Sequence, residues 1–378
     1  MLTKTKIYLS SPHMGGSEQD FVNEAFRTNW IAPLGPNVNG FEDDIKKYIG
    51  GDNYHVAALS SGTASIHIAL ELLGVSAGDE VLCQSFTFSA SANPIVYLGA
   101  KPVFIDSEVD TWNMCPELLE IAIKNRLEAN KKPKAIVAVH LYGMPYKADE
   151  IIAISKKYDI PVIEDSAEAL GSTYKGRHCG TLSDIGIFSF NGNKIITTSG
   201  GGALVSNNED YKKQAIHLST QARDNAPHYE HSSVGYNYRM SNVLAGIGRG
   251  QMEVLDDRVQ ARRGVYDFYK ANLEKFDDIE FLEEPTGFYS NRWITCIKTK
   301  SYEQRENIRL ELLKDDIESR PLWKPMHMQP VFKDCLSFTN GTSEKLFDIG
   351  LCLPSGSNLT QTDLDRILNV IAKTPNLS

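Results

Sequence analysis

The stretch HVAALSSGTASIHIALELLGVSAGDEVLCQS, residues 55–85, decides the fold class of this chain. Its two short apolar runs, 55–60 and 80–85, predict buried β-strands. Residues 63–74 between them predict a helix, because their apolar side chains repeat at helical spacing. The members of that helical face are Ile66, Ala69, Leu70 and Leu73. A strand, a helix and a second strand in this order favour two parallel strands joined by a helical crossover.

The same alternation continues along the chain after this unit. Further strands are predicted at residues 101–106, 134–143, 160–166, 185–190 and 202–207, and further helices at residues 89–99 and 148–159. Repeated crossovers place helices on both faces of a sheet. We therefore predict an α/β fold with a large, mostly parallel sheet covered by helices on both faces.

The pattern changes after about residue 240, where a long polar-rich helix is expected at residues 241–276. Shorter strands and helices follow it. We interpret this helix as the bridge to a smaller C-terminal α/β domain. The predicted boundaries are residues 1–245 for the large domain and residues 246–378 for the bridging helix and the small domain.

Charge and composition exclude several classes of function. The formal net charge of −9 argues against nucleic acid or an anionic membrane as the main partner. The N-terminus lacks the apolar core of a signal peptide, and no apolar run approaches the ~18 residues of a membrane span. The six cysteines form no CxxC pair. A reduced, cytoplasmic setting with free thiols and no metal site is therefore expected.

In open parallel sheets, ligands bind beyond the carboxyl ends of the strands, and four such ends carry informative residues. The first strand runs into Ser61-Gly62-Thr63 and a helix, whose free N–H groups and positive dipole end suit a phosphate. The second strand is followed by Phe88, whose ring can stack on a flat ligand. Taken alone, these residues also fit an ordinary helix N-cap and an ordinary core aromatic.

The other two strand ends carry charged residues. The third ends in Glu164-Asp165, carboxylates that are costly to bury without a partner. The fourth is followed by Lys194, in the stretch SFNGNKIITTSGGG. A lysine held in a restricted loop can act as a nucleophile toward carbonyls. Taken alone, Asp165 also fits a helix cap, and most lysines lie on the surface.

Together, the four strand ends indicate a site for pyridoxal 5′-phosphate (PLP). The helix N-terminus would hold its phosphate, and Phe88 would stack on its ring. Asp165 would keep the pyridine nitrogen protonated, so that the ring withdraws electrons, and Lys194 would bond to the aldehyde. The glycines after Lys194 would let the backbone approach the cofactor closely.

The chain resembles the fold-type I PLP-dependent enzymes of the nucleotide-sugar aminotransferase (DegT-type) family over nearly its whole length. The motifs that carry the resemblance are NWIAPLGP (29–36), SGTASIHIAL (61–70), SFTFSASANPI (85–95), IEDSAEALGS (163–172), SFNGNKIITTSGGG (189–202), GYNYRMSN (235–242) and RPLWKPMH (320–327). Their combination is most similar to enzymes that aminate C4 of UDP-4-keto-6-deoxy-N-acetylglucosamine in the bacillosamine pathway.

The resemblance implies roles for individual residues. Lys194 is the Schiff-base lysine, Asp165 is the partner of the pyridine nitrogen, and Asn237 reaches the phosphate of the neighbouring subunit. Many relatives carry His or Gln at the position of Glu168, close to the cofactor's ring hydroxyl, whereas bacillosamine-type relatives also carry Glu. The other implied cofactor contacts are Gly62, Thr63, Phe88 and Ser189. Candidates for the sugar site, each of which also fits structural packing, are Asn29, Trp30, Ile31, His228, Arg320 and His327.

The resemblance also implies a reaction and partners. L-glutamate donates an amino group, a 4-keto-6-deoxy UDP-sugar accepts it, and the product feeds glycan biosynthesis. The chain is expected to form a homodimer with shared active sites. Residues 1–245 then form the PLP-binding domain, with an N-terminal segment that contacts substrate.

Four alternative functions compete with this hypothesis. A 3-keto sugar aminotransferase fits the same motifs. A sugar 3-dehydratase on the same fold carries His in place of Lys194, which argues against it. A non-catalytic regulator or scaffold is disfavoured because every catalytic position is filled. A dinucleotide-binding oxidoreductase would need a GxGxxG turn after an early strand, and that turn is missing.

Overall fold

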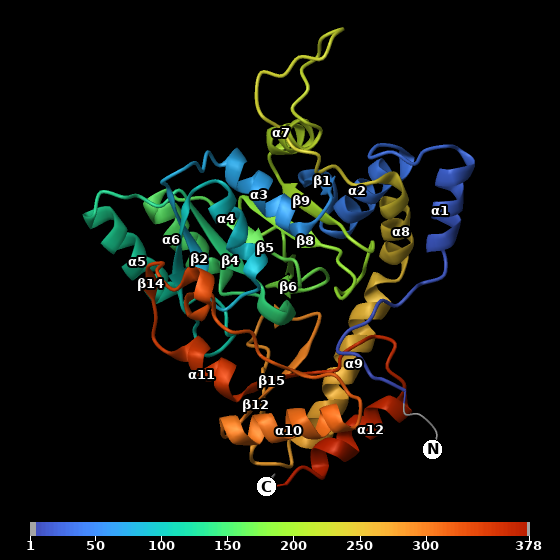
Figure 1. The fold of residues 1–378 in the computed structure, drawn as a ribbon, viewed down its shortest axis with the longest axis vertical. Helices are drawn as coiled ribbons and strands as arrows, with labels where there is room; N and C mark the ends of the chain where they lie inside the picture. Colours follow the sequence, from blue (N-terminus) through green and yellow to red (C-terminus); the bar gives the residue numbers. More distant parts are fainter. Residues whose placement is uncertain (1–4, 376–378) are drawn as a thin grey trace.

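The computed structural model describes residues 5–375 and is built around an eight-stranded sheet (Figure 1). In spatial order its strands are β1 (His55–Leu59), β9 (Gly202–Ser206), β8 (Ile185–Ser189), β5 (Val162–Asp165), β4 (Ala135–Val139), β2 (Glu80–Gln84), β3 (Lys101–Ile105) and β14 (Ser337–Phe338). Strands β8 through β14 in this order run parallel, and β9 runs antiparallel to both of its neighbours. The predicted mostly parallel sheet is confirmed.

The one antiparallel strand explains the position of the loop that carries Lys194. Ser189 at the end of β8 pairs with Gly202 at the start of β9. The chain between them contains no crossover helix, and a short connection of this kind can return only in the antiparallel direction. The loop therefore lies at the edge of the sheet where the parallel strands end.

Helices cover both faces of the sheet, because side chains alternate between the faces along each strand. Val81 and Cys83 of β2 pack toward one face, and Leu82 between them packs toward the other. The first face is covered by α3 (Gly62–Leu72), α4 (Asn93–Tyr97) and α7 (Glu209–Ser219). The second face is covered by α5 (Pro116–Glu128), α6 (Ala148–Tyr158), α2 (Pro36–Tyr48) and α8 (Asn242–Glu253). Helix α1 (Glu18–Arg27) packs on α8.

The C-terminal part of the chain forms a second layer below the large sheet in Figure 1. Its antiparallel sheet has the order β10 (Ile279–Phe281), β12 (Thr295–Thr299), β15 (Gly350–Leu353) and β13 (Arg320–Pro321). Its helices are α9 (Leu255–Leu273), α10 (Tyr302–Lys314), α11 (Thr342–Ile349) and α12 (Gln361–Ala372). A three-stranded sheet joins β11 (Phe288–Tyr289), β6 (Thr173–Tyr174) and β7 (Arg177–His178). Since β14 joins the large sheet, the C-terminal residues also contribute to the first layer.

Two predicted helices differ from the observed ones. The long helix expected at 241–276 is interrupted at Val254, whose φ of −114° and ψ of 10° lie outside the helical region. The break lets α8 pack on α1 and α2 while α9 runs on to α12. The helix expected at 89–99 is reduced to a 3-10 turn at Ser89–Ser91 and the short α4. Pro94 lacks the N–H that a continuous helix would need at that position.

Candidate active site

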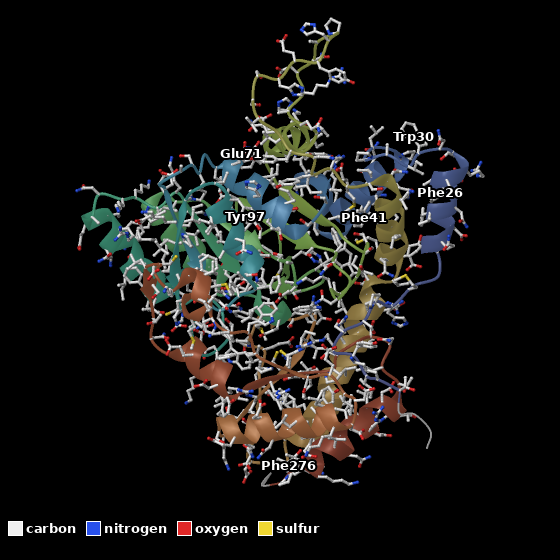
Figure 2. All side chains as sticks on the ribbon, viewed as in Figure 1. Phe26, Trp30, Phe41, Glu71, Tyr97 and Phe276 are labelled. Carbon is white, nitrogen blue, oxygen red and sulfur yellow. The ribbon has the colours of Figure 1, made fainter. Side chains whose placement is uncertain are left out.

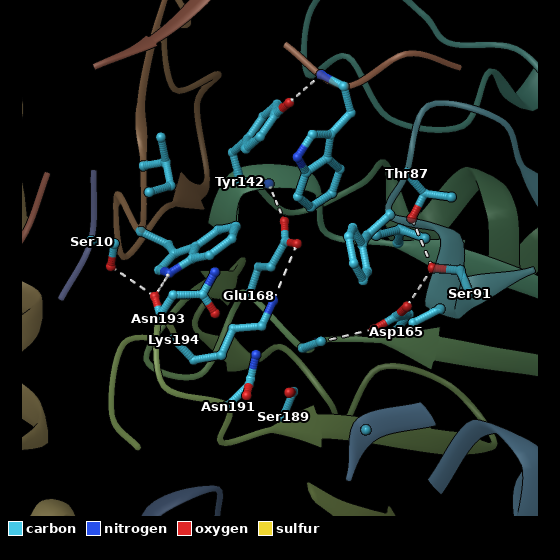
Figure 3. A pocket seen from close by; sticks show the side chains of 18 of the residues that line it. Ser10, Thr87, Ser91, Tyr142, Asp165, Glu168, Ser189, Asn191, Asn193 and Lys194 are labelled. Atoms are coloured by element: carbon cyan, nitrogen blue, oxygen red, sulfur yellow. Dashed lines mark hydrogen bonds and ion pairs between the residues drawn. The ribbon is translucent and has the colours of Figure 1, made fainter. Parts of the chain in front are cut away.

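A cavity of about 390 Å³ lies at the carboxyl ends of the parallel strands, between the large sheet and the C-terminal layer. It brings together residues from distant parts of the sequence, as predicted for this edge of the sheet. The predicted site residues that line it are Gly62, Thr63, Phe88, Asp165, Glu168, Ser189, Lys194 and Arg320. Figure 3 shows this cavity from close by.

The N-terminus of α3 forms one wall of the cavity. The side chain of Ser61 accepts a hydrogen bond from the N–H of Ala64 at 3.0 Å, so the helix begins at a proper cap. The N–H groups of Gly62 and Thr63 have no partner within the helix, because they belong to its first turn. A Cβ atom on Gly62 would lie 3.0 Å from the Cβ atom of Ser189. The glycine thus allows the end of β8 to approach the helix, and the N–H groups that the helix leaves unbonded suit a phosphate.

Asp165 lies at the end of β5 and is 5% exposed. Its Oδ2 atom accepts a hydrogen bond from the Ser91 hydroxyl at 2.6 Å, and its Oδ1 atom accepts one from the Ala167 N–H at 3.2 Å. The Thr87 hydroxyl lies 2.7 Å from Ser91 Oγ and donates to it, since the Ser91 proton is used toward Asp165. Figure 3 shows this chain of three residues. Within residues 5–375 the Asp165 carboxylate has no ion-pair partner, so it can receive a cationic group of a ligand.

Lys194 reaches into the cavity opposite Asp165 (Figure 3). Its side chain is 11% exposed, and its Nζ atom lies 3.4 Å from Glu168 Oε1. The same atom lies 4.3 Å from the ring centroid of Trp293. The Oε2 atom of Glu168 accepts a hydrogen bond from the Tyr142 N–H at 2.7 Å. Burial raises the pKa of Glu168 to about 7, although Lys194 and the Tyr142 N–H act in the opposite direction.

The aromatic side of the cavity comes from both layers. Phe88 is 55% exposed, and its ring centroid lies 5.4 Å from that of Trp323. The Tyr142 hydroxyl accepts a hydrogen bond from the backbone N–H of Trp323 at 2.9 Å. Arg320 lies at the rim, where its side chain pairs with Glu318 at 3.0 Å. A flat ring between Phe88 and the opposite wall would therefore meet mainly apolar surface.

Other predicted substrate residues lie outside this cavity. Asn29, Trp30 and Ile31 are exposed after α1, and Figure 2 shows Trp30 at the outer edge of the molecule. His228 lies in the loop that projects beyond α7 in Figure 1, where it pairs with Glu230 at 2.7 Å. His327 lies behind the cavity wall, between Ser85 at 2.6 Å and Glu344 at 3.0 Å.

Asn237, the residue expected to serve the neighbouring subunit, is also absent from the cavity lining. It is exposed and forms an isolated bridge with Thr220. The exposure of Asn237 fits a residue that acts across a subunit contact. Its role stays a prediction.

The structure adds two residues that the sequence reasoning did not single out. Ser91 holds Asp165, and its place in the motif SFTFSAS, close to Phe88, was the available signal. Trp293 faces Lys194 from the C-terminal layer. Nothing in the pattern around Trp293 distinguishes it from an ordinary core aromatic, because its partner is about 100 residues away in the sequence.

One cluster in the described part of the chain has the composition of a metal site: His140, Glu164 and Cys179, all buried. Both ring nitrogens of His140 and both carboxylate oxygens of Glu164 already form hydrogen bonds. His140 accepts the Tyr146 N–H on Nδ1 at 3.1 Å, which leaves Nε2 to donate to Glu164 at 2.7 Å. Glu164 also accepts the Leu182 N–H at 2.9 Å. These bonds make the cluster a structural support beneath β5. Among residues 5–375, no helix has the length and apolar character needed to cross a membrane.

Comparisons with known proteins agree with this geometry. The model of the DegT/DnrJ/EryC1/StrS aminotransferase family matches residues 12–372. EpsN of Bacillus subtilis (strain 168), whose name describes a pyridoxal phosphate-dependent aminotransferase, is 52% identical over 97% of this chain and 95% of its own. A GDP-perosamine synthase of Escherichia coli O157:H7 is 37% identical over 92% of this chain and 93% of its own.

Solved structures show the same similarity. The PLP form of the sugar aminotransferase Spr1654 from Streptococcus pneumoniae has a TM-score of 0.89 at 28% identity, over 98% of this chain and all of its own. A DegT DnrJ EryC1 StrS aminotransferase from Brucella abortus has a TM-score of 0.88 at 28% identity, over 94% of both chains.

Proposed function

The chain belongs to the DegT/DnrJ/EryC1/StrS aminotransferase family, and we propose that it transfers an amino group from L-glutamate to C4 of a 4-keto-6-deoxy nucleotide sugar. The proposed acceptor is UDP-2-acetamido-2,6-dideoxy-4-keto-hexose. Family membership and the PLP-form structure confirm the coarser expectations: the fold is that of a fold-type I PLP-dependent transferase, the protein is an aminotransferase, and its cofactor is PLP. The substrate, the donor and the roles of individual residues are parts of the proposal.

The observation that carries the proposal is the convergence of three unlike groups on one cavity. The cavity is lined by the amine of Lys194, by the buried carboxylate of Asp165, which has no cationic partner among residues 5–375, and by the helix N-terminus at Gly62. These match the aldehyde, the ring nitrogen and the phosphate of PLP. When bound, PLP supplies a carbonyl that carries the amino group and a ring that withdraws electrons from the reacting carbon.

The chain's own residues then have distinct tasks. Gly62 and Thr63 would bind the phosphate through their N–H groups, and Ser91, which donates a hydrogen bond to Asp165, would hold that carboxylate in place for the ring nitrogen. In each half of the reaction, Lys194 would move one proton between the carbon bonded to the substrate nitrogen and the C4′ carbon of the cofactor, as general base and then as general acid. Glu168, 3.4 Å away, offers the lysine amine a carboxylate partner while it is free.

The acceptor is the part of the proposal that most needs a direct test. Motif similarity favours a UDP-linked 4-keto sugar, whereas the GDP-perosamine synthases among the relatives favour a GDP-linked sugar as a second candidate. Arg320 at the rim is a cationic group that a diphosphate could meet in either case.

A substrate panel separates these candidates. The purified enzyme is incubated with L-glutamate and with UDP- and GDP-linked sugars that carry the keto group at C3 or at C4. Release of 2-oxoglutarate is followed, and the product is identified by NMR. Turnover with the UDP-linked 4-keto-6-deoxy sugar supports the proposal, and Lys194→Ala should abolish it. Turnover with only 3-keto sugars would contradict amination at C4. A strong preference for GDP-linked sugars would contradict UDP as the nucleotide carrier.

We also propose that the active enzyme is a homodimer. The exposed Asn237 and the projecting loop with His228 lie outside their own cavity, as expected for residues that serve a neighbouring subunit. Analytical ultracentrifugation at nanomolar concentration, combined with activity, tests this point. A fully active monomer would contradict it.

A further inference from the structure

Trp293 makes two different contacts with the loop that carries Lys194. The face of its indole ring lies 4.3 Å from the lysine Nζ atom. Its Nε1–H group donates a hydrogen bond to the backbone oxygen of Asn193 at 2.7 Å. One side chain thus contacts both the reactive end of the lysine and the backbone just before it. Trp293 is only 3% exposed, so its own position is fixed by packing.

The backbone around both residues is held by a buried arginine. Arg262 of α9 is 1% exposed and donates hydrogen bonds to the backbone oxygen of Trp293 at 2.5 Å and to that of Lys194 at 3.4 Å. It also donates to Ser10 Oγ at 3.0 Å, and the Ser10 hydroxyl donates to the Asn193 oxygen at 2.7 Å. The N-terminal segment, the lysine loop and the C-terminal layer therefore meet at one point.

The lysine amine contacts both an aromatic face and a carboxylate. Its Nζ atom lies 4.3 Å from the Trp293 ring centroid and 3.4 Å from Glu168 Oε1. Both favour an ammonium group, the first through the ring quadrupole and the second through its charge. The other titratable or charged groups around the amine are Asp165, Tyr142 and Cys352 in the cavity, Glu318 and Arg320 at the rim, and Arg262 behind the backbone.

We propose that Trp293 is a positioning residue for Lys194: its indole face, together with Glu168, holds the lysine amine in place whenever that amine is not bonded to the cofactor. A lysine side chain that is freed in each catalytic cycle would otherwise sample many rotamers, at a considerable entropic cost when it returns. Held in this way, the amine stays close to the atoms between which it must move a proton. This inference rests on the proposed aminotransferase role of Lys194.

The test measures the reactivity of Lys194 in the cofactor-free, full-length chain. Acetylation by acetic anhydride is followed across pH by peptide mass spectrometry, with the exposed Lys213 as the internal reference. Only the neutral amine reacts. The pH midpoint of the labelling rate therefore reports stabilisation of the ammonium form, whereas the rate at high pH reports access to the cavity. A simple opening of the cavity raises the second quantity and also hydrates the amine, which favours the ammonium form and moves the midpoint in the direction opposite to that expected for loss of the Trp293 contact.

Two substitutions and one control decide the outcome. Trp293→Leu should raise the neutral fraction of Lys194 about three- to tenfold at a given pH, as expected for the loss of a buried cation–π contact. Trp293→Phe, which keeps a weaker aromatic face, should raise it about twofold. Tyr302→Leu removes an aromatic ring from a different cation–π pair, with Arg305, and should leave Lys194 unchanged.

An unchanged midpoint in Trp293→Leu would overturn the proposal. Near-ultraviolet circular dichroism shows whether that variant folds, and if it does not, an unchanged midpoint in Trp293→Phe overturns the proposal instead. The measurement contains no sugar and no cofactor. A failure of the substrate panel therefore leaves this inference standing, and a failure here leaves the proposed acceptor untouched.

Discussion

Replacing Glu168 with Gln should change the way the stability of this chain depends on pH. Glu168 is 3% exposed, and burial raises its pKa from the ordinary value of 4.5 to about 7. A carboxyl group whose pKa is higher in the folded chain binds a proton on folding. Its contribution to stability is therefore largest at low pH and is lost as the pH rises through about 7. The sign is opposite to that of a salt-bridged carboxylate with a lowered pKa.

The size of the effect follows from the two pKa values. Each pKa unit corresponds to about 1.4 kcal/mol, so the full difference of about 2.5 units is worth roughly 3 kcal/mol. Between about pH 5.5 and about pH 8.5, roughly 2 kcal/mol of this lies within the measurable range. Glutamine fills the same volume and can accept the Tyr142 N–H, but it does not titrate. The variant should therefore lack this part of the pH dependence.

Urea unfolding of the cofactor-free chain, followed by tryptophan fluorescence at several pH values, measures the effect. The free energy of unfolding of the wild type minus that of Glu168→Gln should fall by about 2 kcal/mol over this pH range, because the titration of groups that do not contact Glu168 cancels in the difference. The same substitution at Glu128, an exposed residue at the end of α5, controls for the loss of one carboxylate. A difference that stays flat or rises with pH would refute the reasoning.

Three further predictions concern the groups that hold the site. Ser91→Ala removes the hydroxyl that donates to Asp165, and since an unpaired buried acceptor costs roughly 1–3 kcal/mol, PLP should dissociate about tenfold more readily in equilibrium dialysis. Asn237→Ala should weaken PLP retention by roughly 1.5–3 kcal/mol if its amide serves the neighbouring phosphate, and unchanged retention would remove it from the site. Arg262→Met leaves the buried backbone oxygens of Trp293 and Ser355 without the guanidinium donor. The free energy of unfolding measured in urea should therefore fall by about 2–4 kcal/mol, and an unchanged value would show that these hydrogen bonds are replaceable.

Local sequence patterns predicted most of the strands and helices of the large sheet layer. The apolar runs and helical spacing of residues 55–85 predicted β1, α3 and β2, because the periods of strands and helices are local properties of the chain. The same spacing did not reveal the break at Val254, because the residues on both sides of it are helical. Only the packing of α8 against other helices shows that α8 and α9 are separate helices. The antiparallel course of β9 was likewise not evident, because strand direction depends on the partner.

The sequence by itself also placed the groups of the cofactor site at the strand ends. Gly62, Asp165 and Lys194 each follow a predicted strand, and parallel strands bring their carboxyl ends to one edge. Only the tertiary structure showed which residues contact these groups: the Trp293 ring lies over Lys194, and the Ser91 hydroxyl donates a hydrogen bond to Asp165. These depend on how the C-terminal layer and the loops fold back onto the sheet. Contacts between residues so far apart in the sequence leave no periodic signal, because they are set by packing in three dimensions rather than by the geometry of one element.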